Sequence, residues 1–215
     1  MSQSGEATPP AVISRITHPS NYGNGAGGSG INKGRQFIVM HGTGKHPTSS
    51  ADDEIRFLSR ENARVSYHYY ITKDGRIFQL VPDEARAWHA GSSRFLFEGV
   101  TYTDLNDWSI GVAFESSNGV HEVYPAPQVR AAMWLVDQLL KKYDLCADSI
   151  VTHREISDPP GRKIDPVNFD IHSFRSALHG PAARRIPAYH PVTNEYLGDI
   201  TIIEDSKGYP GWLKP

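Results

Sequence analysis

Two histidines that end short apolar runs have the residue type and the placement for metal chemistry. His41 closes the run 36–41 (QFIVMH), and His153 closes the run 149–153 (SIVTH). Asp165 follows His153 in the proline-rich segment 157–166 (SDPPGRKIDP). Two imidazoles and one carboxylate supply three ligands and leave a fourth position for water, which is the composition of a catalytic zinc site. A solvated charged loop is the alternative that this spacing leaves open.

The elements that must position these residues alternate between strands and helices. Apolar or β-rich runs predict strands at 36–41, 65–72, 76–82, 108–116 and 149–153, and the two strands around 73–75 (KDG) form a hairpin. Helices are predicted after an N-cap at Ser49 or Ser50, over 127–145 and over 170–180. This order predicts an α/β (α+β) fold in which helices flank a mixed central β-sheet.

The two ends of the chain differ in composition from the middle. Residues 1–35 contain the Gly- and Asn-rich stretch 21–34, which predicts a flexible lead-in to a catalytic domain at 36–180. Residues 181–215 hold two β-prone stretches, 186–189 and 200–203, and we expect a small β-rich appendage, a hairpin docked on the domain. An aromatic and basic contact with the cell wall is the alternative for this segment.

Composition narrows the possible partners and compartments. The net charge of −2 argues against broad nonspecific binding of nucleic acid, which needs a basic surface. A single cysteine, Cys146, excludes an intramolecular disulfide. The first residues lack the pattern of a secretory signal, and no apolar run is long enough to insert in a membrane. We therefore expect synthesis in the cytoplasm without a classical signal peptide.

Five segments that occur in order carry a resemblance to a known family. They are 37–43 (FIVMHGT), 65–91 (VSYHYYITKDGRIFQLVPDEARAWHAG), 105–115 (LNDWSIGVAFE), 151–157 (VTHREIS) and 159–166 (PPGRKIDP). Together they resemble the zinc-dependent N-acetylmuramoyl-L-alanine amidases, a group that includes phage lysozyme-like amidases, bacterial recycling amidases and peptidoglycan recognition proteins. The resemblance implies one zinc ion bound by His41, His153 and Asp165, although many members have cysteine at the third position.

The same resemblance implies catalytic roles for three residues. Lys163 matches the family's catalytic lysine, which would neutralise the oxyanion formed when water adds to the amide carbonyl. Glu115 matches a carboxylate that orients or deprotonates the zinc-bound water, and Tyr67 matches a tyrosine placed near the metal in lysozyme-like amidases. A glutamate that closes an apolar strand is costly to bury without a task or a partner. How Glu115 and Tyr67 share proton handling stays open.

The predicted substrate groove involves three other residues. Trp88 and His89 match one wall of the groove in the family, and Asn106 is suited to bind peptide amides. His68 is expected to point to the opposite face from Tyr67, in the core or behind the site. We expect the remaining histidines to be ordinary surface or packing residues.

These observations predict hydrolysis of the amide bond between N-acetylmuramic acid and L-alanine in peptidoglycan. A lysin of the endolysin type, which would act on the wall after release, is slightly favoured by the insertion at 91–107 and by the appendage. A cytoplasmic recycling amidase that acts on anhydro-muropeptides is the alternative. A muropeptide-binding recognition module without activity is a rival of another class. The oligomeric state is not indicated by the sequence.

Overall fold

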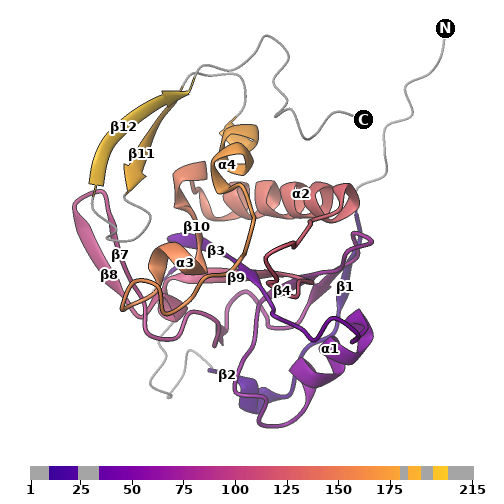
Figure 1. Ribbon diagram of the computed structural model, residues 1–215. Coiled ribbons are helices and arrows are strands. Elements are labelled where there is room, and N and C mark those ends of the chain that lie inside the picture. Colours follow the sequence, from indigo (N-terminus) through magenta and orange to yellow (C-terminus); the bar gives the residue numbers. More distant parts are fainter. Residues whose placement is uncertain (1–9, 24–33, 180–183, 190–195, 203–215) are drawn as a thin grey trace, which may run out of the picture.

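A computed structural model describes residues 10–23, 34–179, 184–189 and 196–202, and its centre is a six-stranded sheet (Figure 1). The strand order is β1-β5-β4-β9-β3-β10. These strands are β1 (Val12–Ser14), β3 (Phe37–Gly42), β4 (Tyr69–Ile71), β5 (Ile77–Gln79), β9 (Ser109–Phe114) and β10 (Ile150–Thr152). Only the β4–β5 hairpin pair is antiparallel among these neighbours, so the sheet is mixed. The predicted α/β fold with a mixed central sheet and flanking helices is confirmed.

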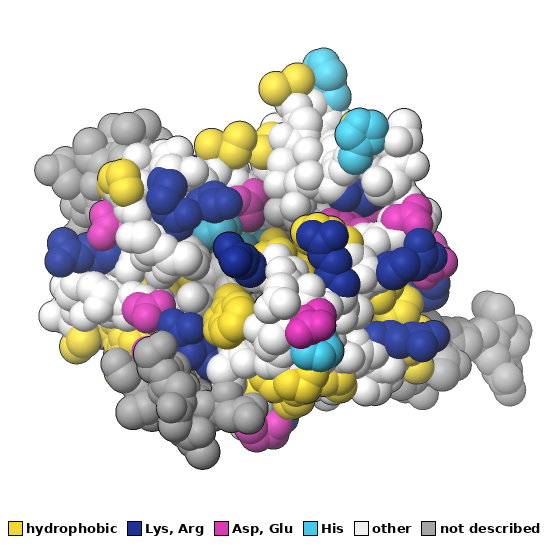
Figure 2. Space-filling view, turned by 90° about the horizontal axis from the view of Figure 1, so that it is seen from below, with side chains coloured by type: hydrophobic (Ala, Val, Ile, Leu, Met, Phe, Trp, Pro, Cys, Tyr) yellow, Lys and Arg dark blue, Asp and Glu magenta, His cyan; other side chains and the backbone are white. Residues whose placement is uncertain are grey.

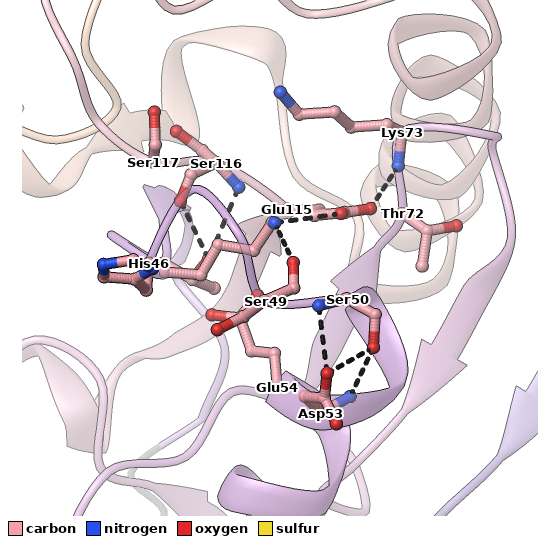
Figure 3. Close-up of polar contacts among 12 residues, drawn as sticks. His46, Ser49, Ser50, Asp53, Glu54, Thr72, Lys73, Glu115, Ser116 and Ser117 are labelled. Carbon is pink, nitrogen blue, oxygen red and sulfur yellow. Dashed lines mark hydrogen bonds and ion pairs between the residues drawn. The ribbon is translucent and has the colours of Figure 1, made fainter.

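The helices lie on both sides of this sheet. They are α1 (Ala51–Ser59), α2 (Ala126–Tyr143), α3 (His153–Ile156) and α4 (Ile171–His179), with short 3-10 helices η1 (Pro19–Asn21), η2 (Leu105–Asp107) and η3 (Ala147–Ser149). In Figure 1, α2 and α4 lie above the sheet and α1 lies below it. The α1 helix begins after Ser50, whose side chain accepts a hydrogen bond from the Asp53 backbone N–H (Figure 3). The N-cap is therefore the second of the two serines that the sequence suggested.

The side chains of β3 divide between two cores. Ile38 and Met40 pack in the large apolar cluster that includes Leu135 of α2, whereas Val39 packs in a second cluster with Phe95. Because successive side chains of a strand point to opposite faces, His41 lies on the same face as Val39, away from α2. The sheet thus has one face that packs on α2 and α4, and an opposite face that carries His41.

Within the part of the chain that the structure describes, three short strand pairs lie outside the central sheet. They are β2 (Tyr22–Gly23) with β6 (Arg86–Ala87), β7 (Arg94–Phe97) with β8 (Val100–Thr103), and β11 (Arg184–Tyr189) with β12 (Tyr196–Ile202). The last pair is antiparallel, in the segment where we expected a hairpin. The rest of 181–215 lies outside the described residues, and docking of this segment on the domain stays a prediction.

Two elements differ from the sequence-based expectation. The edge strand β1 pairs in parallel with β5, so part of the segment 1–35, expected to be a flexible lead-in, belongs to the sheet. The β7–β8 hairpin lies inside the segment 91–107, for which the sequence predicts an insertion without strands of its own. Its turn has positive φ at both Glu98 (49°) and Gly99 (78°), the conformation favoured in two-residue hairpin turns. None of the helices within the described ranges has the length and apolar character needed to cross a bilayer.

Candidate metal centre

The three predicted ligands meet at the carboxyl ends of two neighbouring strands. β10 pairs in parallel with β3, with Val151 opposite Val39 and Thr152 opposite Met40, so the chain places His153 beside His41. The Nδ1 atom of His153 lies 3.1 Å from Asp165 Oδ2, and the Nδ1 atom of His41 lies 3.5 Å from the same oxygen. All three side chains are buried, and their ligand atoms lie within 4.8 Å of one another. The predicted cluster is therefore assembled.

The hydrogen bonds of the two imidazoles leave one nitrogen of each directed at this cluster. Nε2 of His153 donates to the Ala90 carbonyl at 3.0 Å, and Nε2 of His41 lies 2.9 Å from His89 Nδ1. Nδ1 of His41 is buried without a hydrogen-bond partner. An unpaired buried polar atom is unfavourable, and metal-binding histidines usually donate their other N–H to a neighbour. Both observations fit a divalent cation that is bound by the two Nδ1 atoms and Asp165.

Burial and mutual contacts fix the charge states of this cluster. Burial lowers the pKa of His41 to about 4, because it outweighs the opposing effect of Asp165. Burial acts to raise the pKa of Asp165, but the His153 and His41 imidazoles beside its carboxyl group hold that pKa well below its usual range. At neutral pH, His41 is therefore a neutral imidazole and Asp165 a carboxylate. These are the forms that bind a metal ion.

The short helix α3 holds two of the predicted ligands together. Its N-cap residue Thr152 forms a reciprocal capping box with Glu155, and Arg175 of α4 donates to the Glu155 carboxylate at 3.1 Å. The backbone N–H of Arg154 donates to the Asp165 carbonyl at 3.0 Å. His153, the first residue of α3, and Asp165 are thus tied to the same helical turn.

The loop before Asp165 is fixed by an arginine that the sequence analysis did not single out. Nη2 of Arg162 donates to the carbonyls of Ala90 (2.9 Å) and Ser92 (2.6 Å). The Ala90 carbonyl therefore receives both this guanidinium and the His153 ring. Lys163 follows Arg162 directly and is exposed. It lies close enough to His41 for its charge to contribute to the low pKa of that imidazole. The predicted catalytic lysine is thus carried by an anchored loop beside the ligands.

Tyr67 lies beside the cluster, as predicted, and the protonation state of its phenol can be assigned. The centre of its ring lies 5.2 Å from that of His41, and the side chain is buried. Burial, together with the charges of Asp165 and Glu54, raises the pKa of Tyr67 well above its ordinary value. Its phenol therefore stays protonated at neutral pH and can donate a hydrogen bond.

Glu115 follows β9 and is held by two lysine residues rather than by a ligand of the cluster. Its Oε2 atom accepts a hydrogen bond from the Lys73 backbone N–H at 2.8 Å (Figure 3). Its Oε1 atom lies 3.5 Å from the Lys45 ammonium, which is largely buried. By strand alternation from Ala113, which pairs with His41, Glu115 belongs to the same face of the sheet as His41. Its carboxylate has the partners that a buried charge requires.

The three residues predicted to line the substrate groove do not share one environment. Trp88 is half-buried, whereas His89 and Asn106 are buried. Oδ1 of Asn106 accepts hydrogen bonds from the backbone N–H groups of His89 (2.9 Å) and Ala90 (2.7 Å). Direct contact with substrate is therefore better supported for Trp88 than for the other two. Asn106 supports the segment that carries His89.

The expectation that His68 lies in the core or behind the site agrees with its contacts. Its ring lies 5.8 Å from that of His89, however, on the same face of the sheet as His41 and Tyr67 rather than opposite Tyr67. Its side chain is fully buried, its Nδ1 accepts from the Gly111 backbone N–H at 2.9 Å, and its Nε2 lies 3.1 Å from the Ala85 carbonyl. Burial lowers its pKa to about 3, aided by the nearby charge of Arg35. His68 is therefore a neutral core residue beside the candidate site.

The molecular surface opposite the α2 and α4 layer is rich in positive charge. Figure 2 shows the molecule from below, with Lys and Arg side chains spread over this side among Asp and Glu side chains. Such a surface is compatible with an anionic ligand, although the net charge of the whole chain is −2.

Comparison with known proteins identifies relatives of this arrangement. AmpD of Citrobacter freundii, described as a 1,6-anhydro-N-acetylmuramyl-L-alanine amidase, is 34% identical over 130 residues, which are 60% of this chain and 65% of that protein. The N-acetylmuramoyl-L-alanine amidase AmiD of Escherichia coli is 33% identical over 146 residues, 61% of this chain and 48% of its own length. The chain thus spans about half to two thirds of the length of these curated relatives.

Solved structures and the family profile agree with these relatives. A crystal structure of AmpD superposes with a TM-score of 0.63 at 26% identity, covering 78% of this chain and 93% of the other. The endolysin LysCS from Clostridium intestinale shares the fold, with a TM-score of 0.58 at 21% identity over 80% of this chain and 98% of its own. The family profile described as N-acetylmuramoyl-L-alanine amidase matches residues 32–168, a range that contains all three residues of the cluster. On this match, the chain belongs to the N-acetylmuramoyl-L-alanine amidase family.

Proposed function

We propose that this protein is a zinc-dependent amidase that hydrolyses the bond between the lactyl group of N-acetylmuramic acid and L-alanine in muropeptides. The observation that carries the proposal is the buried cluster of His41, His153 and Asp165, in which a buried imidazole nitrogen has no hydrogen-bond partner. Its donor set suits zinc with an open fourth position. A recognition module without activity has less support, because this chain keeps all three ligands.

The side chains around the cluster suit the steps of amide hydrolysis. Zinc bound there would supply Lewis-acid activation of water and of the scissile carbonyl. Glu115, whose carboxyl group contacts the Lys45 ammonium and the Lys73 backbone N–H, is the proposed acceptor of the proton from water. The neutral phenol of Tyr67 and the ammonium of Lys163 are proposed to stabilise the oxyanion. The amine of L-alanine must gain a proton when the carbon–nitrogen bond breaks.

The relatives favour soluble anhydro-muropeptides as the first substrate to test. The curated AmpD proteins are described as 1,6-anhydro-N-acetylmuramyl-L-alanine amidases. AmiD, at 28% identity and a TM-score of 0.51 over 61% of this chain and 52% of its own, was solved with anhydro-N-acetylmuramic acid-L-Ala-D-γ-Glu-L-Lys. The surface rich in Lys and Arg in Figure 2 is compatible with such anionic peptides. The endolysin-type role, supported by the shared fold with LysCS, is the second candidate.

The test is digestion of purified anhydro-muropeptide and, separately, of intact sacculi, followed by mass spectrometry. We expect one water to be added and a stem peptide with a free L-alanine amine to be released. Cleavage of the soluble substrate alone indicates recycling, and efficient cleavage of sacculi indicates a lysin. Zinc content is measured in parallel, and His41→Ala, His153→Ala and Asp165→Ala should each lose both metal and activity. A zinc-loaded protein that cleaves neither substrate contradicts the proposal.

A further inference from the structure

His89 stands directly behind the metal ligand His41. The Nδ1 atom of His89 lies 2.9 Å from His41 Nε2, on the side of that ring facing away from Asp165. The two rings meet edge to face, with centres 4.9 Å apart and planes at 83°. His41 is fully buried and His89 is 5% exposed. His89 is therefore placed to act on the ligand rather than on the substrate.

Three separate contacts hold the His89 ring in this position. Asn106 Oδ1 accepts from the His89 backbone N–H at 2.9 Å, and Ser109 Oγ lies 3.4 Å from His89 Nε2. The ring also lies against Gly111 of β9, where an added Cβ would come within 2.6 Å of His89 Cγ. A glycine inside a strand often marks such a close approach. The sheet thus leaves space at Gly111 that the imidazole fills.

The donor and the acceptor of each hydrogen bond that joins Ser109, His89 and His41 can be assigned, starting from Ser109. Ser109 Oγ donates to the Leu105 carbonyl at 2.5 Å, so its oxygen is available to accept a proton from His89 Nε2–H. With its proton on Nε2, His89 presents a bare Nδ1 that accepts from His41 Nε2–H. His41 then carries no proton on Nδ1, the nitrogen that faces Asp165. Ser109, His89 and His41 thus have mutually consistent donor and acceptor roles in this row of hydrogen bonds.

We propose that His89 is a positioning residue that accepts the His41 Nε2 proton and thereby selects the tautomer of His41 with a free Nδ1 for the metal. Neutral imidazole would otherwise divide between two tautomers, and the form protonated on Nδ1 cannot bind the ion through that atom. The neighbour of a metal-binding histidine typically affects metal affinity by about 10- to 100-fold. The proposal rests on the metal site of the proposed function.

A matched pair of variants tests the acceptor separately from the volume of the side chain. His89→Asn keeps an oxygen near the position of Nδ1, whereas His89→Leu has nearly the same shape as asparagine and no acceptor. We expect zinc affinity, measured by competition with a chromophoric chelator, to fall about 10- to 100-fold in His89→Leu and to change little in His89→Asn. Gly111→Ala, which leaves His89 in the chain but crowds its ring, should also weaken zinc binding.

A second measurement reads the tautomer itself. Long-range 1H–15N correlation spectra of the zinc-free wild-type protein should show the His41 proton on Nε2, and His89→Leu should shift it toward Nδ1. Equal zinc affinity in both His89 variants and the wild type, or equal loss in both variants, overturns the proposal, because the acceptor would then make no difference. A wild-type His41 protonated on Nδ1 overturns it as well, even if His89→Leu does not fold. If the wild type fails to bind zinc, the proposed function is refuted instead. The spectra of the zinc-free protein still show which nitrogen of His41 carries the proton, so they still test the role of His89.

Discussion

At the scale of single residues, the site contains two kinds of groups that respond differently to substitution. His41, His153 and Asp165 converge on one point and have few other partners there. Lys163 and Glu115 do not belong to that cluster, since Lys163 is exposed and Glu115 contacts Lys45 and Lys73. Loss of a ligand should therefore release the metal, while loss of either of the other two should leave it bound.

Lys163→Met and Glu115→Gln test this division. Both variants should keep one zinc but lose about two orders of magnitude in kcat, as is typical when an oxyanion-stabilising or proton-transferring group is removed. Lys163→Met, at an exposed position, should also keep the wild-type melting temperature. Turnover of an anhydro-muropeptide and zinc content are measured on the same samples. Lys141→Met on the exposed side of α2 is the control, with unchanged kcat. Near wild-type rates in both site variants would show that their assigned roles are wrong.

The residues of the site were predictable from the sequence to different degrees. His41 and His153 end apolar runs that must be buried strands, so their placement followed from the pattern. The burial of His89 and Asn106 depends on how the segment after β6 folds back onto β9, and spacing along the chain does not encode this. The only local signal was Gly111 inside an apolar strand, which indicates close packing without naming the partner.

At the scale of elements, hydrogen bonds connect the loop 157–165 to the segment 90–92. Arg162 joins them through two carbonyls, and His153 of α3 shares one of these carbonyls. This loop carries both Lys163 and Asp165. A change in the loop should therefore affect catalysis and metal affinity at once.

Arg162→Ala is expected to loosen this connection. Because Arg162 is largely exposed, we expect a loss of about 1 kcal/mol in stability, or about 2–4 °C in Tm, together with a several-fold loss in both zinc affinity and kcat. Calorimetry, chelator competition and turnover measure the three effects. Arg154→Ala is a matched control, since Arg154 is also exposed and only its backbone N–H contacts Asp165. If the two variants behave alike, the guanidinium of Arg162 does not anchor the loop.

The strength of the apolar pattern explains which strands could be predicted from the sequence. The strands β3 and β9 are buried along their whole length, so continuous apolar runs revealed them. The edge strand β1 has only three residues with one half-buried side chain, and the β7–β8 hairpin is largely exposed. These elements gain their order from pairing with other strands rather than from a strong local pattern.

At the scale of the whole molecule, the two faces of the sheet have different chemistry. The face toward α2 and α4 packs as an apolar core, whereas the other face buries, among the described residues, the histidines His41, His68, His89 and His153. The pKa values of His41, His68 and His89 are lowered, chiefly by burial, so these three rings are neutral in the folded protein. The candidate site thus makes the fold sensitive to acid.

His68 allows this sensitivity to be measured without changing a ligand. Its pKa is about 3 in the folded protein and about 6.5 when unfolded, so below pH 6.5 the unfolded chain binds a proton that the folded chain does not. The contribution of His68 to the free energy of unfolding is therefore highest above pH 6.5 and falls as the pH is lowered toward 3. From pH 7 to pH 5 the contribution of His68 to this fall is about 2 kcal/mol.

His68→Asn removes this titration while keeping an acceptor for the Gly111 N–H. In urea unfolding of the zinc-free proteins, the wild type should lose about 2 kcal/mol more than His68→Asn between pH 7 and pH 5, whatever their difference at pH 7. His121→Asn, which replaces an exposed histidine, should follow the wild type. His41 contributes in the same direction in all three proteins, because its pKa is also lowered, to about 4. An identical pH dependence in His68→Asn and the wild type would mean that His68 takes up its proton without unfolding, and that this face of the sheet is open to water.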